Sequence, residues 1–428
     1  MQGKPLVFDV AAIREACESR LPYPAGLGDF LKYLPAGKIG YSKIAKNALL
    51  IPESIALMIS PSGCSRHCSC NALFAGEGQR FFSLRLNEVD IASGLFPAKI
   101  EAALAEIFRG LGYTPKAAVL ISTCVDALAG TDYGAYTKSW SEKFSTRVTR
   151  LAMNPILEDS PSPHKIETIR TLYGFIAPQP QLPRMPLINV LGRVAAVSPA
   201  SELGEIAGKY GGCQLRHISQ CRSLAEFDEM GRARLNITIP IGESAGKDME
   251  KKYGIPYVVL RPSYHPDTVA DNYRRLGEAL GTTIDDGEYY QSVKELAART
   301  AGKYGRWRGA VGESIDDQPL VLARDLLDMG FDIRYVFIEK IRPGDLPALR
   351  WLEQNAPGLR VLISAHPSMA GFSLTSDDID YAVGLLKSFY WRAPDIPVVD
   401  VDEQPFDYFG IRSLLTALAT ALEAKKGD

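Results

Sequence analysis

Short apolar runs rich in β-branched residues alternate along this chain with longer stretches in which apolar side chains recur at helical spacing. Such alternation predicts strands that are joined by helices, the arrangement that builds parallel sheets. Helices are expected, for example, at 96–112, 244–254 and 411–427. The runs expected to be strands form three groups, at 54–60, 81–86, 117–122 and 147–153, then at 187–197, 213–218, 234–240 and 256–262, and finally at 306–312, 332–339, 360–366 and 396–402.

The three groups of strands predict three domains. Prolines among polar residues at 176–186 interrupt both helix and strand, so we place the first boundary there. The expected domains are 1–180, 181–300 and 301–428. The first contains the N-terminal helices and can also accept the C-terminal helix against it. No unit of 20 to 50 residues repeats in the sequence, which favours three similar architectures over a solenoid.

Composition narrows the class of protein. A chain of 428 residues is too long for one core, and its apolar residues, 46% of the total, are enough to form several cores. A net charge of -2 provides no basic surface for nucleic acid or an anionic membrane, so the expected partners are small molecules and proteins. The first residues carry charges without an apolar signal core, and no apolar run is long enough to span a bilayer. We therefore expect a cytoplasmic protein.

Three of the seven cysteines lie within the segment SPSGCSRHCSCN at 60–71. An odd cysteine count in a reducing compartment disfavours a disulfide framework and leaves metal binding, catalysis or burial. Cys64 follows one expected strand in a Pro-Ser-Gly-Cys turn, and Cys124 follows another strand of the same group. Since the carboxyl ends of parallel strands meet at one crevice, these two thiols are expected to lie close together. A third strand end brings Glu88 and Gly94 to the same edge.

The spacing of these cysteines does not fit a self-contained metal site. Cys64, Cys68 and Cys70 lack the second ligand pair of a zinc site, and a C-x3-C-x2-C radical-enzyme loop would need its last thiol at Asn71. The sequence also has no phosphate-binding or dinucleotide-binding glycine loop. The remaining cysteines have no glycine-turn context and are interpreted as packed residues: Cys17, Cys213 and Cys221.

Five segments in order carry a family resemblance. They are PSGC at 61–64, LNEVDIASG at 86–94, LISTCVDALAGTD at 120–132, MEKKYGIPY at 249–257 and PFDYFGIRSLL at 405–415. Together they resemble the nitrogenase component 1 superfamily, which includes nitrogenase subunits, a cofactor-assembly scaffold, the dark-operative protochlorophyllide and chlorophyllide reductases, and a reductive cyclase of nickel tetrapyrrole synthesis. The resemblance implies an α/β fold of three Rossmann-like parallel-sheet domains around a central cavity.

The same resemblance implies that Cys64, in the turn with Gly63, and Cys124 ligate an iron-sulfur cluster at a subunit interface. The family often has a further upstream cysteine, but the matching stretch AGKIGYSKIAKN at 36–47 has none. Either the cluster takes fewer ligands from this chain, or Cys68 or Cys70 replaces the missing thiolate. A 4Fe-4S cluster is therefore expected rather than an eight-iron cluster, which needs three cysteines from each side. We favour a cluster shared across a two-fold axis, for which neither replacement is needed.

The resemblance also bears on the cavity. Gly246 lies nearest the place where nitrogenase has a cofactor-binding cysteine, and no histidine follows His366. A molybdenum cofactor of the usual type is thus not expected. The strand end that carries His366 and Ser368 offers the cavity an acid or a hydrogen-bond donor, although a single histidine at a strand end is more often packed or capping.

Two functions follow from this resemblance. In the first, the chain is a subunit of a nitrogenase-like reductase, an oxidoreductase component that receives low-potential electrons through the cluster from an ATP-hydrolysing iron-sulfur reductase. The substrate, a small molecule or a tetrapyrrole, would sit in the cavity. In the alternative, the chain is a scaffold for assembly of a metallocluster or tetrapyrrole. The second subunit would be a copy of this chain or a related one, in a homodimer, heterodimer or heterotetramer.

Overall fold

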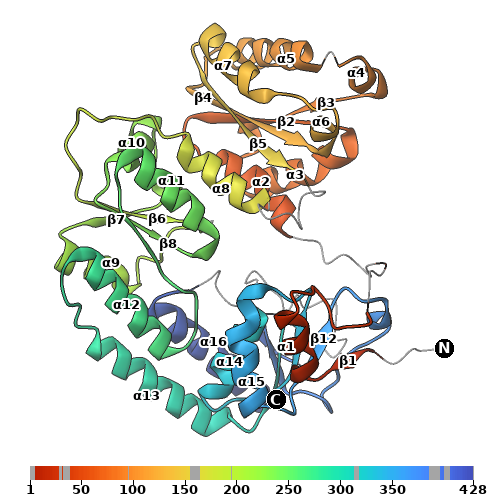
Figure 1. Ribbon diagram of the computed structural model, residues 1–428, viewed down its shortest axis with the longest axis vertical. Helices are drawn as coiled ribbons and strands as arrows, with labels where there is room; N and C mark the ends of the chain where they lie inside the picture. Colours follow the sequence, from red (N-terminus) through yellow and green to blue (C-terminus); the bar gives the residue numbers. More distant parts are fainter. Residues whose placement is uncertain are drawn as a thin grey trace.

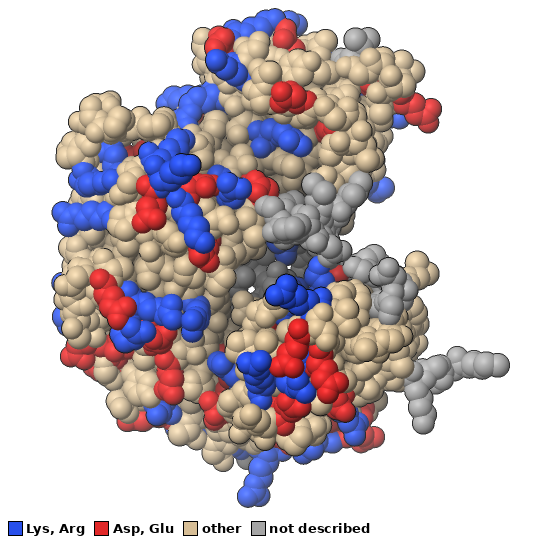
Figure 2. All heavy atoms as spheres, viewed as in Figure 1, with Lys and Arg blue, Asp and Glu red and all other residues tan. Residues whose placement is uncertain are grey.

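The computed structural model describes residues 5–27, 31, 39–94, 96–154, 164–193, 195–312, 318–384, 396–399 and 405–427. The fold is α/β and contains three sheets, each in its own lobe (Figure 1). The lobes follow one another along an arc, and Figure 2 shows an indented outline between the first and the third. The predicted α/β architecture built on parallel sheets is confirmed.

The first sheet has four parallel strands in the order β3-β2-β4-β5. These strands are β2 (Ser54–Ser60), β3 (Phe81–Arg85), β4 (Ala117–Thr123) and β5 (Arg147–Met153). Both faces are covered, because one core cluster contains residues of α2, α3 and α8 and another contains residues of α5 and α7. The helices of this lobe are α2 (Ile39–Leu49), α3 (Ser62–Phe74), α4 (Glu88–Ser93), α5 (Phe96–Leu111), α6 (Cys124–Leu128), α7 (Tyr133–Phe144) and α8 (His164–Gly174). Burial on both faces explains why β2 and β4 are apolar along their central residues without alternation.

The second sheet is also fully parallel, in the order β7-β6-β8-β9. Its strands are β6 (Leu187–Leu191), β7 (Gln214–Arg216), β8 (Leu235–Thr238) and β9 (Tyr257–Val259). The helices that follow them are α9 (Glu202–Gly211), α10 (Leu224–Glu229), α11 (Glu243–Tyr253), α12 (Pro266–Leu280) and α13 (Gly287–Tyr304). As expected, α11 ends at Gly254, whose φ of 68° is a left-handed conformation that glycine adopts without strain.

The third sheet has six strands in the order β1-β12-β11-β10-β13-β14, parallel except for β1. Its strands are β1 (Val7–Phe8), β10 (Arg308–Val311), β11 (Asp332–Ile338), β12 (Arg360–Ile363), β13 (Tyr381–Val383) and β14 (Val398–Val399). Its helices are α1 (Val10–Glu18), α14 (Pro319–Asp328), α15 (Leu346–Asn355) and α16 (Tyr408–Gly427). The expected strand at 396–402 continues into positions that lie outside the described residues.

The two ends of the chain both belong to the third lobe. We expected the N-terminal helices in the first domain with residues 1–180, whereas β1 pairs with β12 and α1 packs against α15. The C-terminal helix α16 packs against α13 and β14. The pairing of β1 covers an edge strand that would otherwise expose its backbone N–H and C=O groups. Within the described residues, no helix is long and apolar enough to cross a bilayer.

Candidate functional site

Cys64 lies where the first sheet turns into α3. Strand β2 ends at Ser60, Pro61 precedes the helix, and the Cys64 N–H donates to the Pro61 carbonyl at 3.1 Å. The thiol is exposed in the first turn of the helix. Gly63 beside it is also exposed, and a side chain there would meet no atom within 4 Å. The turn therefore presents Cys64 at an open carboxyl edge of the sheet.

Cys124 occupies the corresponding place on the neighbouring strand. It is the first residue of α6, directly after β4, and it is half-buried. Strands β2 and β4 pair in parallel, with Met58 opposite Ile121. The two strands therefore deliver Cys64 and Cys124 to the same edge, as the sequence predicts.

The two thiols are near enough to influence each other. Burial and, after it, the charge of Cys124 raise the pKa of Cys64. Each cysteine lies in the first turn of a helix. A pair of such thiols provides two ligands for a soft metal centre such as an iron-sulfur cluster.

Cys68 and Cys70 continue along α3 but differ in their surroundings. Cys68, one turn beyond Cys64, is 2% exposed and packs into the core beside α2. Burial and the charge of Cys64 raise the pKa of Cys68 to about 11. Cys70 is exposed. Among the described residues no three His, Cys, Asp or Glu side chains come together as ligands of a single ion.

At the third strand end, Glu88 is exposed at the start of α4 and Gly94 ends that helix with a φ of 65°. The helix is capped by reciprocal bonds between Asn87 and Asp90, and Lys99 pairs with Asp90 at 2.5 Å. Gly94 thus provides the left-handed conformation that ends the helix. Glu88 lies on the same sheet edge as the two thiols.

His366 and Ser368 form a local cap after β12. The Nδ1 atom of His366 lies 2.8 Å from the Ser368 hydroxyl and accepts the Ser368 N–H at 3.1 Å, while Leu6 N–H donates to that hydroxyl at 3.0 Å. Burial lowers the pKa of His366. His217 makes the same His-x-Ser arrangement with Ser219 after β7, at 2.7 Å. The repeat supports a capping role, and an acid role for His366 stays a prediction.

Gly246 is a buried residue of α11. A Cβ atom placed there would lie 3.1 Å from Cγ of Tyr257, so the absence of a side chain lets α11 approach β9. A cysteine at this position would need the Tyr257 ring to move.

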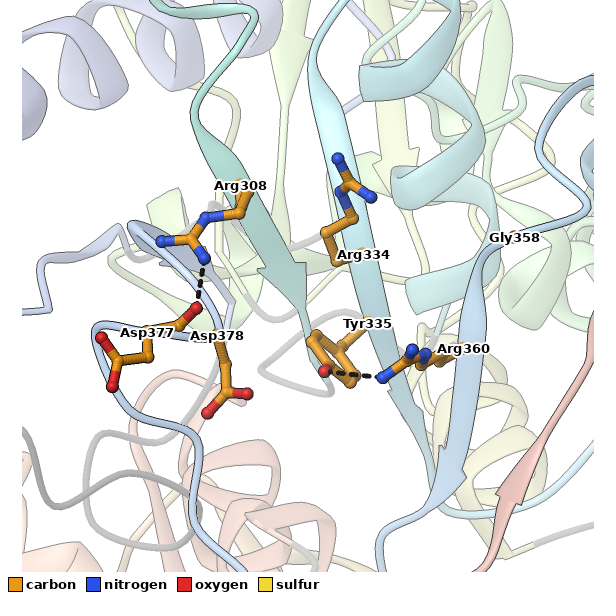
Figure 3. A pocket seen from close by; sticks show the side chains of 7 residues that line it. All are labelled: Arg308, Arg334, Tyr335, Gly358, Arg360, Asp377 and Asp378. Carbon is orange, nitrogen blue, oxygen red and sulfur yellow. Dashed lines mark hydrogen bonds between the residues drawn. The ribbon is translucent and has the colours of Figure 1, made fainter.

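A pocket of about 260 Å³ lies in the third lobe at the starts of β10, β11 and β12, the opposite edge from His366 (Figure 3). Its charged groups are largely engaged with the protein. Arg308 pairs with Asp380 at 3.0 Å, Arg334 pairs with Asp332 at 2.7 Å, and Arg360 donates to the Tyr335 hydroxyl at 3.1 Å. None of the predicted site residues lines it.

Three residues behind Cys124 were not predicted from the sequence. Asp126 is 1% exposed and accepts the Thr123 N–H at 2.8 Å, and Tyr133 is 3% exposed. Arg150 of β5 places its guanidinium 4.9 Å from the centre of the Tyr133 ring. A carboxylate three residues after a buried strand was the available signal, but Tyr133 and Arg150 come from other elements. The three packed cysteines were predicted correctly, since Cys17, Cys213 and Cys221 are all buried.

Comparison with known proteins gives the family of the chain. Residues 46–423 match the family model described as nitrogenase component 1 type oxidoreductase. Relatives include the nitrogenase iron-molybdenum cofactor biosynthesis protein NifE of Clostridium pasteurianum, 26% identical over 60% of this chain and 57% of that protein. NifE of Nostoc sp. is 27% identical over 51% of this chain and 45% of its own length. The chain thus spans about half the length of these curated relatives.

Solved structures show the same fold. A structure described as nitrogenase Cp1 at pH 6.5 superposes with a TM-score of 0.69 at 14% identity, covering 90% of this chain and 92% of the other. The corresponding structure at pH 5 gives a TM-score of 0.62 at 15% identity, with coverage of 90% and 88%. At this identity the likeness concerns the three-sheet architecture alone.

Proposed function

The chain belongs to the family of nitrogenase component 1 type oxidoreductases, and from this premise we propose that it is the cluster-bearing subunit of a nitrogenase-like reductase. Cys64 and Cys124 would each give one thiolate to an iron-sulfur cluster of the 4Fe-4S type. Such a cluster supplies one-electron transfer at low potential. The observation that carries the proposal is the delivery of both thiols to one open sheet edge by the paired strands β2 and β4.

The number of thiols supports a cluster shared with a second chain. A four-iron cluster takes four ligands, and Cys64 and Cys124 account for two. Cys68 is buried on the core side of α3, and Cys70 is exposed six residues beyond Cys64. Two-fold pairing of this edge with the same edge of another component 1 chain would supply the remaining ligands. We therefore propose a dimer, or a larger assembly with a sister chain.

The electron source in this proposal is an ATP-hydrolysing iron-sulfur reductase, since the sequence has no nucleotide-binding loop of its own. The electron acceptor is a small molecule or tetrapyrrole held between the lobes. A molybdenum cofactor of the usual type is not part of the proposal, because Gly246 stands where its thiolate would be and is packed against Tyr257.

A second function is favoured by the named relatives. Both NifE proteins are described by their role in cofactor biosynthesis, and each is more similar in sequence to this chain than the nitrogenase Cp1 structures are. The chain would then be a scaffold on which a metallocluster or tetrapyrrole is built and passed on.

The two functions are separated by mixing anaerobic protein with an ATP-hydrolysing iron-sulfur reductase. We expect ATP-dependent reduction of the cluster, followed by its reoxidation when a substrate tetrapyrrole or small molecule is added. Cluster reduction without turnover of any added compound would support the scaffold. If the cluster is not reduced by the ATP-hydrolysing reductase, with or without an added compound, the reductase proposal is contradicted.

A further inference from the structure

A buried polar cluster lies directly behind Cys124, on the face of the first sheet that α5 and α7 cover. Asp126, two residues beyond Cys124, is 1% exposed, and Tyr133, the first residue of α7, is 3% exposed. Arg150, on the neighbouring strand β5, is half-buried. Asp126 lies in the Cys124 turn, and Tyr133 and Arg150 come from other elements, so the cluster places two opposite charges beneath that turn.

Bonds to the protein fix both charged groups. Oδ2 of Asp126 accepts the backbone N–H of Thr123 at 2.8 Å, which ties the carboxylate to the residue that precedes Cys124. Nε of Arg150 donates to the hydroxyl of Ser122 at 2.6 Å. The Arg150 guanidinium carbon also lies 4.9 Å from the centre of the Tyr133 ring, within the range of a cation-π contact. These contacts orient both side chains behind Cys124.

The carboxylate is incompletely paired. Its Oδ1 atom is buried and makes no well-formed hydrogen bond with the described residues, although the Tyr133 hydroxyl lies nearby. Asp126 and Arg150 are bonded to consecutive residues, Thr123 and Ser122, and the structure shows no direct ion pair between these two described side chains. In a site with little water, such charges act over longer distances than they would at the surface.

We propose that Asp126 and Arg150, a pair of opposite charges behind Cys124, set the reduction potential of the redox group held by Cys124. The inference rests on the proposed function. Adding one electron from the reductase makes an iron-sulfur cluster more negative, so a nearby carboxylate opposes that step and a nearby guanidinium favours it. Removing one member of the pair should shift the potential in one direction, and removing the other should shift it in the opposite direction.

The test compares isosteric and charge-keeping variants at a fixed pH of about 8, well above the ordinary carboxyl range. Asp126→Asn keeps an acceptor for the Thr123 N–H and removes the charge. Arg150→Gln removes the guanidinium, and Arg150→Lys keeps a positive charge. The matched control is Asp132→Asn, because Asp132 is exposed and only caps α7 through Gly134 at 2.8 Å.

Anaerobic redox titration, monitored by electron paramagnetic resonance, gives the midpoint potential of each protein. The midpoint should rise in Asp126→Asn and fall in Arg150→Gln, while Arg150→Lys and Asp132→Asn stay within error of the wild type. All four variants should keep their iron. Shifts of equal sign in Asp126→Asn and Arg150→Gln, or an Asp126→Asn midpoint equal to that of Asp132→Asn, would overturn the inference.

Iron content separates the remaining outcomes. If Asp126→Asn loses iron while its circular dichroism is unchanged, Asp126 is needed to hold the Cys124 turn, and the charge-pair inference is overturned. If the wild-type protein binds no iron, or if alanine at Cys64 and Cys124 leaves the iron in place, the proposed function itself fails. These results come from different proteins and cannot be confused.

Discussion

At the carboxyl edge of the first sheet, Cys64 is exposed and Cys124 is half-buried at the starts of two helices. At the carboxyl edge of the third sheet, Nδ1 of His366 is engaged with Ser368, and Ser368 is in turn bound to Leu6. The two edges are topologically equivalent and both carry residues suited to chemistry. They differ in whether backbone groups of the turn already occupy the hydrogen-bonding atoms of those residues.

The difference shows that residue type at a strand end does not identify a site by itself. An imidazole or hydroxyl next to an uncapped turn satisfies backbone N–H groups and is then committed to the fold. Thiols are weak hydrogen-bond partners, so they serve poorly as caps and remain available to metal ions. A strand-end cysteine that is exposed and near a second one is therefore the stronger sign of a site.

The largest expected effect concerns the surface around the cysteines. Val89 and Leu128 are 73% and 76% exposed at the same sheet edge. Contiguous exposed apolar patches mark contact surfaces, and we expect these two side chains to belong to one. In a shared site, Val89→Glu with Leu128→Glu should dissociate the oligomer and release most of the iron, measured by light scattering and metal analysis.

The matched control for this surface is Tyr113→Glu. Tyr113 is 58% exposed, but it precedes β4 and so lies at the opposite edge of the sheet. This variant should keep both its oligomeric state and its iron. Full iron retention in a monomeric Val89/Leu128 variant would mean that one chain completes the cluster alone.

A second prediction sharpens the comparison between the two His-x-Ser caps. Burial, supplemented by the charges of Arg193 and Lys46, lowers the pKa of His217 to about 4 from an ordinary 6.5. Between pH 6.5 and about 4, His217 therefore binds a proton in the unfolded chain but not in the folded protein. Stability should fall by about 3 kcal/mol as the pH drops from 6.5 to 4, and it should be unaffected by this group above 6.5.

The measurement is urea unfolding of the iron-free protein across that pH range. His217→Asn keeps an acceptor for the Ser219 N–H and should flatten the slope. His366→Asn, at a half-buried site, should leave most of the slope in place. Equal slopes for His217→Asn and the wild type would show that this buried imidazole is not the source of acid sensitivity.

Gly246→Ala tests whether the second lobe has room for a ligand at that position. The added Cβ would lie 3.1 Å from the Tyr257 ring, so we expect a loss of about 1–3 kcal/mol in urea unfolding. Gly204→Ala is the control, because it lies in α9 with no atom within 4 Å of its added Cβ. That change should stabilise the protein slightly through helix propensity. A stabilised Gly246→Ala would reveal an open space beside α11.

The smallest effects are expected at the two remaining cysteines of α3. Cys68→Ser places a hydroxyl in an apolar, 2% exposed position, which should cost an amount at the lower end of about 1–3 kcal/mol. Cys70→Ser, at an exposed position, should cost little. Both should keep most of their iron on metal analysis. Loss of iron from Cys68→Ser with the dimer intact would make Cys68 a ligand.

Much of the fold could be predicted from the sequence because the buried strands are strongly patterned. The expected strands at 54–60 and 147–153 coincide with β2 and β5. In contrast, β13 (Tyr381–Val383) and β1 (Val7–Phe8) are too short to show a period, and they exist because neighbouring strands accept their backbone groups. The placement of β1 in the third sheet depends on pairing across more than 350 residues, which no local pattern encodes.

The candidate site divides in the same way. Cys64 and Cys124 were predicted to meet because both follow strands of one parallel group, and the structure brings those strand ends together. The cap formed by His366 requires the backbone geometry of the turn, and the contact of Arg150 with Ser122 requires the register of β5 on β4. Chemistry that depends on chain order was predictable, whereas chemistry that depends on tertiary pairing was not.

The central claim is tested most directly by the iron and acid-labile sulfide content of anaerobically purified Cys64→Ala and Cys124→Ala, with His366→Ala as the control from the other edge. The account predicts about four irons per cluster in the wild type and the control, and nearly none in either cysteine variant. Circular dichroism should be unchanged in all of them, since each lobe has its own sheet. Full iron and sulfide in both cysteine variants would contradict the account.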